Sequence, residues 1–311
     1  NVDISRIHVA KGFSVEESFL EGKLVDQINS FLSAGSIDQD PENLLANANK
    51  CFEGFVPYGE GFVVDDSSDG ATSTAEIADI VDREPQSSEI ILPYLGGEDV
   101  TDDPGIAPSR RVIFVAQMGE EELKERYPSI YGLLERKVRP FRMSKSERVS
   151  KAPWWQFLWS RPKLSKRMRL IDHMIVISRV SKHHAFVRVP SNVVPSTRLS
   201  VIALSENSSY AVIQSRTHES WARYFGASRG VTANYSPSDC FENFPFPVNV
   251  ETDPTLEAEG EAYHVFRAQL MIARNEGLTK TYNRFHARGE NAADIVRLRA
   301  LHHEMDIAVL R

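Results

Sequence analysis

The amino-acid sequence predicts an α+β fold, in which a mixed β-sheet with flanking helices is followed by a C-terminal helical bundle. Short apolar runs of strand length recur between residues 90 and 204. After Pro254 the apolar residues instead recur every three or four positions, as they do on one face of a helix. The last such face comprises Ile295, Leu298, Leu301, Met305 and Val309.

Strands are expected where apolar residues alternate with polar ones, or form a short run that ends at turn residues. The expected strands are residues 4–10, the run from Ile90 that enters a tight turn at Gly96 and Gly97, and residues 111–116, 174–180, 185–189 and 199–204. The strand at 111–116 is almost wholly apolar, so we expect both of its faces to be buried.

Helices are expected where apolar residues return at helical spacing, or where proline occupies a favourable first turn. The expected helices are residues 20–32, 74–82, 119–136, a stretch that begins at Pro153, and residues 208–224, 255–275, 279–287 and 291–311. Apart from the helix at 74–82, residues 34–90 are expected to be irregular, because glycine, proline and acidic residues interrupt them.

A chain of 311 residues, of which 41% are hydrophobic, is long enough for two or three domains at ~100–200 residues each. We place the boundaries where the pattern changes. The expected domains are an irregular N-terminal segment at 1–90, a mixed-sheet domain at 91–250 and a helical domain at 251–311.

No membrane-spanning segment or leader is expected, because no apolar run approaches ~20 residues and the start is not a basic, apolar leader. The two cysteines, Cys51 and Cys240, favour a reducing compartment, so we expect a cytoplasmic protein. The chain starts at Asn1 without methionine and ends within a helical pattern. We interpret both ends as cuts in a longer protein, although removal of a start methionine is an alternative.

The net charge of −7 conceals a strong asymmetry along the chain. Residues 1–135 hold 9 Lys/Arg and 27 Asp/Glu, a net charge of −18, whereas residues 136–188 hold 15 Lys/Arg and 2 Asp/Glu, a net charge of +13. Such asymmetry is expected of a protein that binds phosphates on one face. A solvated helical surface would carry the same charges, so charge alone leaves both interpretations open.

Polar and cationic side chains are concentrated at the turn that follows the strand at 174–180. Hydroxyl groups and cations bind phosphate oxygens, and arginine also pairs bidentately with guanine in the major groove. The turn therefore predicts DNA contacts, with a merely polar hairpin turn as the alternative. The candidate residues are Ser178, Arg179, Ser181, Lys182 and His183.

A second polar loop, at 228–236, lies between a predicted helix and Pro237. Such a loop on a rigid scaffold suits base-edge contacts by Arg, Asn and Thr, although a surface connection without a ligand explains it equally well. Its candidates are Ser228, Arg229, Thr232 and Asn234, and Arg198 and Arg216 complete the expected DNA contacts.

The motifs for metal or cofactor chemistry fail on their spacing. The pairs His183–His184 and His302–His303 lack further ligands at zinc spacing. The acidic run from Asp65 to Glu76 has the spacing of a calcium loop, but no helix precedes it. Residues 59–61 (GEG) lead into a strand rather than the helix that a nucleotide site requires, which predicts a glycine hairpin. We expect no metal, no catalytic residue and no cofactor in this chain.

Several strings follow one another in a characteristic order and spacing. They are PYLGGEDV at 93–100, YG and KVRP within 131–140, WWQ at 154–156, VISRVSK at 176–182, HESWA at 218–222, YSPSDCFENFPFP at 235–247, LTKTYN at 278–283 and the helical pattern at 298–306. Together they resemble the C-terminal target-recognition region of MmeI-like (type IIG/IIL) restriction–modification DNA adenine methyltransferases. The resemblance covers nearly the whole chain, and the phenylalanine–proline string is its most specific part.

The resemblance implies a bacterial phage-defence enzyme that methylates N6 of adenine with S-adenosylmethionine, with or without an endonuclease. Residues 91–250 would then recognise the DNA target, and residues 1–90 would be the trailing edge of the methyltransferase core and a linker. The family's Asn-Pro-Pro-(Tyr/Phe) signature and its glycine motif for the methyl donor are both absent here. The implied S-adenosylmethionine and catalytic core therefore belong upstream in the same chain.

We therefore expect this chain to recognise a sequence in double-stranded DNA as the specificity part of a larger methyltransferase, with no chemistry of its own. The cationic span 136–188 would contact phosphates, and the loops 178–184, 196–200 and 228–236 would read base edges. This requires the cations and the loops to meet beside one cleft. Two alternatives stay open, a separate specificity subunit and a non-catalytic protein-interaction scaffold.

Overall fold

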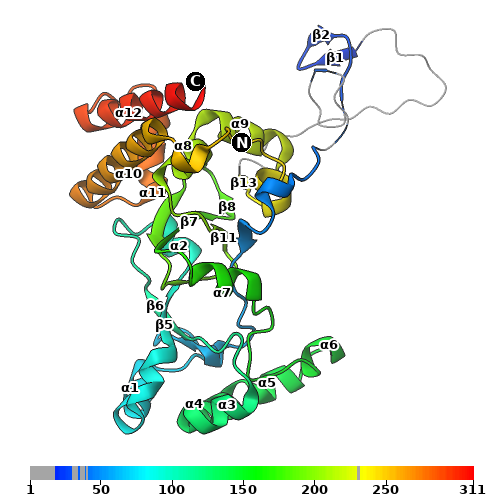
Figure 1. The fold of residues 1–311 in the computed structure, drawn as a ribbon, viewed down its shortest axis with the longest axis vertical. Helices are drawn as coiled ribbons and strands as arrows, with labels where there is room; N and C mark the ends of the chain where they lie inside the picture. Colours follow the sequence, from blue (N-terminus) through cyan, green and yellow to red (C-terminus); the bar gives the residue numbers. More distant parts are fainter. Residues whose placement is uncertain (1–17, 30–33, 36–38, 40, 230–231) are drawn as a thin grey trace, which may run out of the picture.

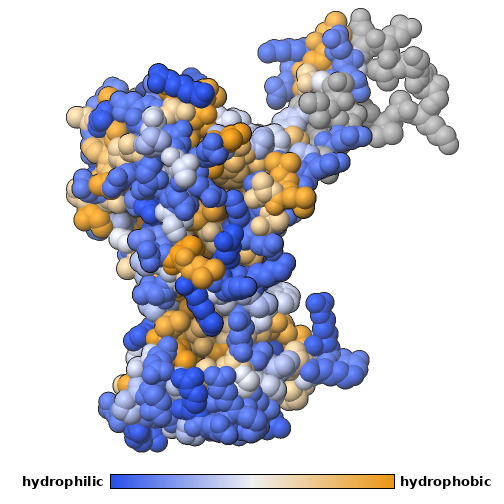
Figure 2. Space-filling view, viewed as in Figure 1, coloured by the Kyte–Doolittle hydropathy of each residue, from blue (hydrophilic) through white to orange (hydrophobic). Residues whose placement is uncertain are grey.

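The computed structural model describes residues 18–29, 34–35, 39, 41–229 and 232–311, so the expected strand at 4–10 lies outside the described residues. Figure 1 shows an upper part that carries the C-terminal helices and a lower part formed mainly by the cyan and green segments. The molecule narrows between the two parts, and the space-filling view narrows at the same place (Figure 2).

The central sheet has the strand order β3-β11-β7-β9, and all its neighbouring strands are antiparallel. Its strands are β3 (Cys51–Glu53), β7 (His173–Ser178), β9 (Val187–Pro190) and β11 (Leu199–Ile202). The side chains from Met174 to Ile177 are all buried, in agreement with the uninterrupted apolar run. The strands predicted at 174–180, 185–189 and 199–204 are confirmed, and β3 comes from a segment predicted to be irregular.

A second sheet in the lower part has the order β10-β5-β6-β4. Its strands are β4 (Val63–Val64), β5 (Ile91–Leu95), β6 (Arg110–Ile113) and β10 (Val194–Pro195). The strands predicted from Ile90 and at 111–116 are confirmed. The tight turn predicted after β5 is wrong, because Gly96 is instead the N-cap of a short helix, α2 (Gly97–Thr101), and donates its N–H to the Asp99 carboxylate at 2.6 Å.

A small third sheet joins two segments far apart in the sequence. Its order is β12-β13-β8, formed by β8 (Val180–Ser181), β12 (Ser228–Arg229) and β13 (Thr232–Asn234). Ala233 pairs with Ser181 and Asn234 pairs with Val180. The polar loops at 178–184 and 228–236 therefore lie side by side.

The helix predicted at 20–32 is wrong in its described residues. Residues 18–25 form a hairpin of β1 (Ser18–Leu20) and β2 (Lys23–Val25). Glu21 and Gly22 between them both have positive φ, 51° and 77°. Two positive φ angles define the two-residue turn that matches the twist of paired strands, so the local turn overrides the helical pattern.

The helix predicted to begin at Pro153 is also wrong, because residues 153–160 form turns. Their aromatic side chains pack in the hydrophobic core, although the backbone is not helical. Trp154 is buried, and the ring of Phe157 packs edge-to-face against three others, Phe55, Phe62 and Phe114. Nearby helices are short and were not predicted: α5 (Arg139–Met143), α6 (Glu147–Ser150) and α7 (Pro162–Met168). The glycine hairpin predicted at 59–61 is a 3₁₀ turn, Glu60–Phe62, that leads into β4.

Two predicted helices are each divided by one residue. The helix at 119–136 becomes α3 (Glu120–Arg126) and α4 (Pro128–Lys137), because Tyr127 precedes a proline and leaves the helical region. The helix at 208–224 becomes α8 (Asn207–Gln214) and α9 (Arg216–Phe225), because the Ser215 side chain accepts from the N–H of His218 and caps α9. The helix at 74–82 is confirmed as α1 (Thr74–Arg83).

The three C-terminal helices are confirmed as α10 (Pro254–Arg274), α11 (Leu278–His286) and α12 (Ala293–Val309). Helix α10 packs closely on α8 at Gly260, where an added Cβ would lie 2.1 Å from the carbonyl oxygen of Asn207. Only glycine allows this approach. Within the described part of the chain, no helix has both the length and the apolar composition required to cross a membrane.

Candidate functional site

The three polar loops predicted to read base edges meet at Arg179. Its backbone N–H donates to the carbonyl oxygen of Arg198 at 2.8 Å, and its own carbonyl oxygen accepts from the N–H of Tyr235 at 2.8 Å. The pairing of β13 with β8 continues this connection. Because all three are joined through the backbone, the loops form one surface whose parts hold each other in position.

A groove with a volume of about 910 Å³ opens at this surface. Four predicted residues line it: Ser178, Arg179, Arg198 and Asn234. Polar residues that sequence reasoning missed complete the lining, among them Ser67, Ser68, Glu98, Thr101 and Arg110. They come from the loop after β4, from α2 and from β6, so no local sequence signal could have grouped them with the predicted loops.

Arg179 is held by a carboxylate that the sequence did not indicate. Its Nη2 lies 2.9 Å from Oε1 of Glu53 on β3, and Nη2 of Arg161 lies 2.5 Å from the other oxygen of Glu53. The three side chains are each 26–33% exposed, so the ion pairs are partly shielded from water. Glu53 therefore fixes the direction of Arg179 and connects it to Arg161, the residue before α7.

The acidic residues beside the groove have structural partners. Asp65 accepts from the side chains of Ser67 and Ser68, and these hydrogen bonds lower the pKa of its carboxyl group. Asp66 accepts from Thr74, which also lowers the pKa of Asp66. Among the residues that the structure describes, no group of three His, Cys, Asp or Glu is arranged to hold a metal ion.

Lys182 and His183 are not among the groove-lining residues and contact α11 instead. Nζ of Lys182 donates to Oδ1 of Asn283 at 2.7 Å, and Nε2 of His183 lies 2.9 Å from the same oxygen. His183 is 8% exposed, and burial lowers its pKa. Through these contacts both residues connect the hairpin to the C-terminal helices. Contact of either residue with DNA stays a prediction.

Ser181 and Arg216 are not among the groove-lining residues, and Ser228, Arg229 and Thr232 are located here only by their strands. Ser181 donates its hydroxyl to the carbonyl of His183 at 2.9 Å, inside its own turn. Ser228, Arg229 and Thr232 belong to the adjoining β12–β13 hairpin. Arg216 begins α9 and lines a separate hollow.

The cations of residues 136–188 were expected to come together beside the polar loops, and the structure brings only some of them there. Six of the 15 form ion pairs with carboxylates: Arg136, Lys137, Arg139, Lys151, Arg161 and Arg179. Arg142 is fully buried and donates to three carbonyls, those of Pro57, Tyr58 and Gln156. Burial lowers its pKa to about 10. Much of the positive charge is therefore engaged within the chain, partly by carboxylates of the acidic first third.

Exposed cations remain on and after α7, which Figure 1 places in the narrow middle of the molecule. Lys163, Lys166 and Arg169 are exposed there, and no carboxylate in the described part of the chain forms an ion pair with them. Arg161 at the start of α7 shares Glu53 with Arg179, so this end of the helix adjoins the groove residues. Lys145 and Arg148, beside and on α6, are exposed as well, so the remaining positive charge of this span is divided between α7 and α6.

Comparison with known proteins identifies the family. Residues 40–248, well over half of the chain, match the family described as "MmeI, target recognition domain". The chain belongs to this family. The resemblance of the motif strings to MmeI-like enzymes is therefore confirmed, and so is the α+β fold with a C-terminal helical region.

Two solved structures are similar to the chain. The type IIL restriction–modification enzyme MmeI, solved in complex with DNA, matches with a TM-score of 0.64 at 19% identity, over 92% of this chain and 36% of MmeI. The type IIG restriction endonuclease BpuSI matches with a TM-score of 0.35 at 12% identity, over 86% of this chain and 32% of BpuSI. No curated protein matches the sequence. The chain thus shares its fold with MmeI and spans about a third of that enzyme's length.

The matched range bears on how the chain is divided. It begins at residue 40, and β3 and β4 from this early part pair with β11 and β6. The segment 41–90 therefore contributes to the two main sheets. The boundaries at 90 and 250 stay a prediction.

Proposed function

We propose that this chain binds double-stranded DNA and recognises a base sequence through the groove at Arg179. The observation that carries the proposal is the convergence of three polar loops at one groove in a member of the MmeI target recognition domain family. The relative MmeI was solved in complex with DNA.

The groove lining has the chemistry that base edges require. Arginine binds guanine bidentately, asparagine binds adenine bidentately, and glutamate accepts from cytosine N4. Arg198, Asn234 and Glu98 supply these groups from three different segments, and Arg198 and Glu98 are exposed. Serine and threonine residues, whose hydroxyl groups can contact any base, also line the groove.

The exposed cations at α7 would supply the contacts that do not depend on sequence. Lys163, Lys166 and Arg169 have long side chains suited to phosphate oxygens. Because Glu53 connects Arg161 with Arg179, phosphate contacts at α7 and base contacts in the groove would fix one register on the duplex.

We further propose that this recognition serves a larger bacterial restriction–modification enzyme in the cytoplasm. Its methyltransferase core, upstream in the same chain, would bind S-adenosylmethionine and transfer a methyl group to N6 of adenine. The target adenine must leave the base stack to be methylated, so the recognition domain would hold the duplex during that step. An upstream Asn-Pro-Pro-(Tyr/Phe) core in the same reading frame would support this proposal, and its absence would favour a separate specificity subunit.

Binding measurements test the DNA-recognition proposal directly. Duplexes selected by the chain from a randomised library are titrated by fluorescence anisotropy at several salt concentrations. We expect log Kobs to fall with log salt, with a slope of about −0.9 for each phosphate contacted. Arg198→Ala should lower the preference for the selected sequence by ~1–3 kcal/mol. Arg83→Ala, an exposed substitution on α1, is the control. Failure to bind any duplex at low salt would contradict the proposal and favour a protein-interaction scaffold.

A further inference from the structure

A second hollow, outside the groove, lies among the C-terminal helices. It has a volume of about 390 Å³ and is lined by residues of α9, α11, the α11–α12 connection and α12. Three of its residues are arginines, Arg216, Arg288 and Arg299, and His286 and His303 add two exposed imidazoles. Burial lowers the pKa of His286 to about 4, so this imidazole is uncharged near pH 7. The three arginines, from α9, the α11–α12 connection and α12, thus bring positive charge to one small space from three separate segments.

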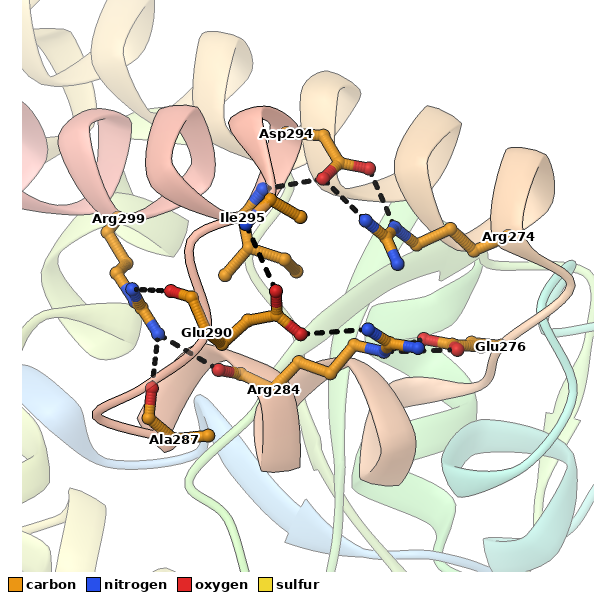
Figure 3. A network of polar contacts seen from close by, with 9 residues as sticks. Arg274, Glu276, Arg284, Ala287, Glu290, Asp294, Ile295 and Arg299 are labelled. Atoms are coloured by element: carbon orange, nitrogen blue, oxygen red, sulfur yellow. Dashed lines mark hydrogen bonds and ion pairs between the residues drawn. The ribbon is translucent and has the colours of Figure 1, made fainter.

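The single acidic residue in this lining is already engaged. Oδ1 of Asp306 accepts from the backbone N–H of Arg216 at 2.9 Å, and its Oδ2 lies 3.0 Å from Nδ1 of His302. Two nearby acids are turned to other partners, as Figure 3 shows: Asp294 binds Arg274, and Glu290 binds Arg284. Nη1 of Arg216 lies 4.0 Å from Oε2 of Glu219, at the limit of an ion pair. Arg288 and Arg299 form no ion pair with any carboxylate that the structure describes. The hollow therefore keeps positive charge, chiefly at Arg288 and Arg299.

Arg299 makes the hollow a pre-formed site. Its guanidinium group donates to the backbone carbonyls of four residues, Arg284, Phe285, Ala287 and Glu290, at 2.7–3.0 Å, three of which are labelled in Figure 3. These hydrogen bonds satisfy backbone carbonyl groups at the C-terminal end of α11, and they fix the backbone of the α11–α12 connection, which includes Arg288. Arg288 is exposed, and no ion pair ties it to a carboxylate in the described part of the chain. It is thus a cation on a fixed backbone, available to a ligand.

The hollow adjoins the hairpin that borders the groove. The ring of His286 in its lining stacks on His183, with ring centroids 5.2 Å apart and planes inclined by 15°. His183 belongs to the turn after β8, next to Lys182. A long polyanion on the groove could therefore continue past this turn to the hollow.

We propose that the hollow at Arg216 and Arg288 binds a backbone phosphate of the DNA duplex that occupies the groove. This inference rests on the proposed function, and it adds a contact site on the C-terminal helices. Such a contact contributes affinity without sequence information, because a phosphodiester is the same at every base pair.

The test measures the salt dependence of duplex binding for Arg288→Ala and for a matched control. Arg297→Ala removes the same charge from an exposed position on α12, where Arg297 pairs with Glu304 outside the hollow. We expect Arg288→Ala to weaken binding of selected and unrelated duplexes alike, by roughly 5- to 10-fold near 0.1 M salt, and to reduce the salt slope by about 1. Arg297→Ala should change neither quantity appreciably.

Phosphate ethylation of the selected duplex identifies the contacted position. We expect one phosphate whose ethylation weakens binding by the wild-type chain but not by Arg288→Ala. Duplex binding by Arg288→Ala equal to that of Arg297→Ala would overturn the inference while leaving groove recognition intact. A wild-type chain that binds no duplex would overturn both. Circular dichroism and thermal unfolding confirm that each variant is folded.

Discussion

Nη2 of Arg179 lies 2.9 Å from Oε1 of Glu53, and the other oxygen of that carboxylate binds Arg161. The pair joins the end of β7 to the edge strand β3, about 125 positions earlier in the sequence. An arginine directed in this way can present its remaining donors to a guanine with little loss of side-chain freedom. Glu53 is therefore a positioning residue in the proposed interface.

Glu53→Gln tests this positioning role. The substitution keeps the size of the side chain but removes the charge that holds both arginines, so Arg179 should sample more directions. We expect the preference of the chain for the selected duplex over unrelated duplexes to fall by ~1–3 kcal/mol. Binding to unrelated duplexes should stay the same or strengthen, because Arg161 and Arg179 lose their ion pairs with Glu53. Anisotropy titrations measure both. Glu251→Gln, at the exposed Lys50–Glu251 pair, is the control. Equal weakening on all duplexes would assign Glu53 a merely structural role.

Asn234 offers a separate test of base readout, because it lies on β13 in the groove lining. Asn234→Ala should relax discrimination at one base-pair position, at a cost of ~1–3 kcal/mol on the selected duplex. The readout is binding to a set of duplexes that vary one position at a time. Asn192→Ala, in an exposed loop outside the groove lining, should leave the pattern unchanged. A uniform loss across the set would mean that Asn234 contacts the backbone instead.

The elements that could be predicted from the sequence are those with a strong periodic pattern. Strand β7 and helices α10 to α12 were placed closely, because their apolar residues form an unbroken run or a helical face. The division at Tyr127 also had a local signal, since Pro128 follows it. The strand predicted after residues 59–61 corresponds to β4. Strands β3 and β10 span only three and two residues, and distant partners stabilise them. No local pattern could reveal these strands.

The candidate site was predictable only in part for the same physical reason. The polar and cationic composition of loops 178–184 and 228–236 marked them as candidate sites, and the pairing of β8 with β13 brings them together. Glu53 and Glu98 carried no such signal, because their role depends on which strands pair. Charge counting failed at Arg142, since composition does not distinguish a buried hydrogen-bonding arginine from an exposed one.

Arg267 allows a prediction about stability, because it is a fully buried cation among three tyrosines of the C-terminal region. It donates to the Phe186 carbonyl at 2.5 Å and to the Tyr282 hydroxyl at 2.9 Å. Arg267→Ala leaves these acceptors unsatisfied and opens a cavity, so we expect a loss of about 2–5 kcal/mol in the free energy of unfolding. Urea unfolding measures it, with the exposed Arg297→Ala as control. A loss below about 1 kcal/mol would show that the site collapses or admits water.

The buried histidines beside the hairpin predict that stability falls in mild acid. Burial lowers the pKa of His184 to about 4 and that of His218 well below its usual range. The unfolded chain takes up these protons near pH 6.5 and the folded chain does not, so stability is complete above about pH 6.5 and declines toward pH 4. At pH 5 each group should cost about 2 kcal/mol.

His184→Phe tests the origin of this pH dependence. Phenylalanine keeps the ring that contacts Phe186, whose centroid lies 4.8 Å from that of His184, but it cannot be protonated. The difference in unfolding free energy between pH 7.5 and pH 5, from urea titrations, should shrink by about 2 kcal/mol in the variant. His303→Phe replaces an exposed histidine on α12 and should leave that difference unchanged. An identical pH profile for wild type and His184→Phe would mean that other groups cause the acid sensitivity.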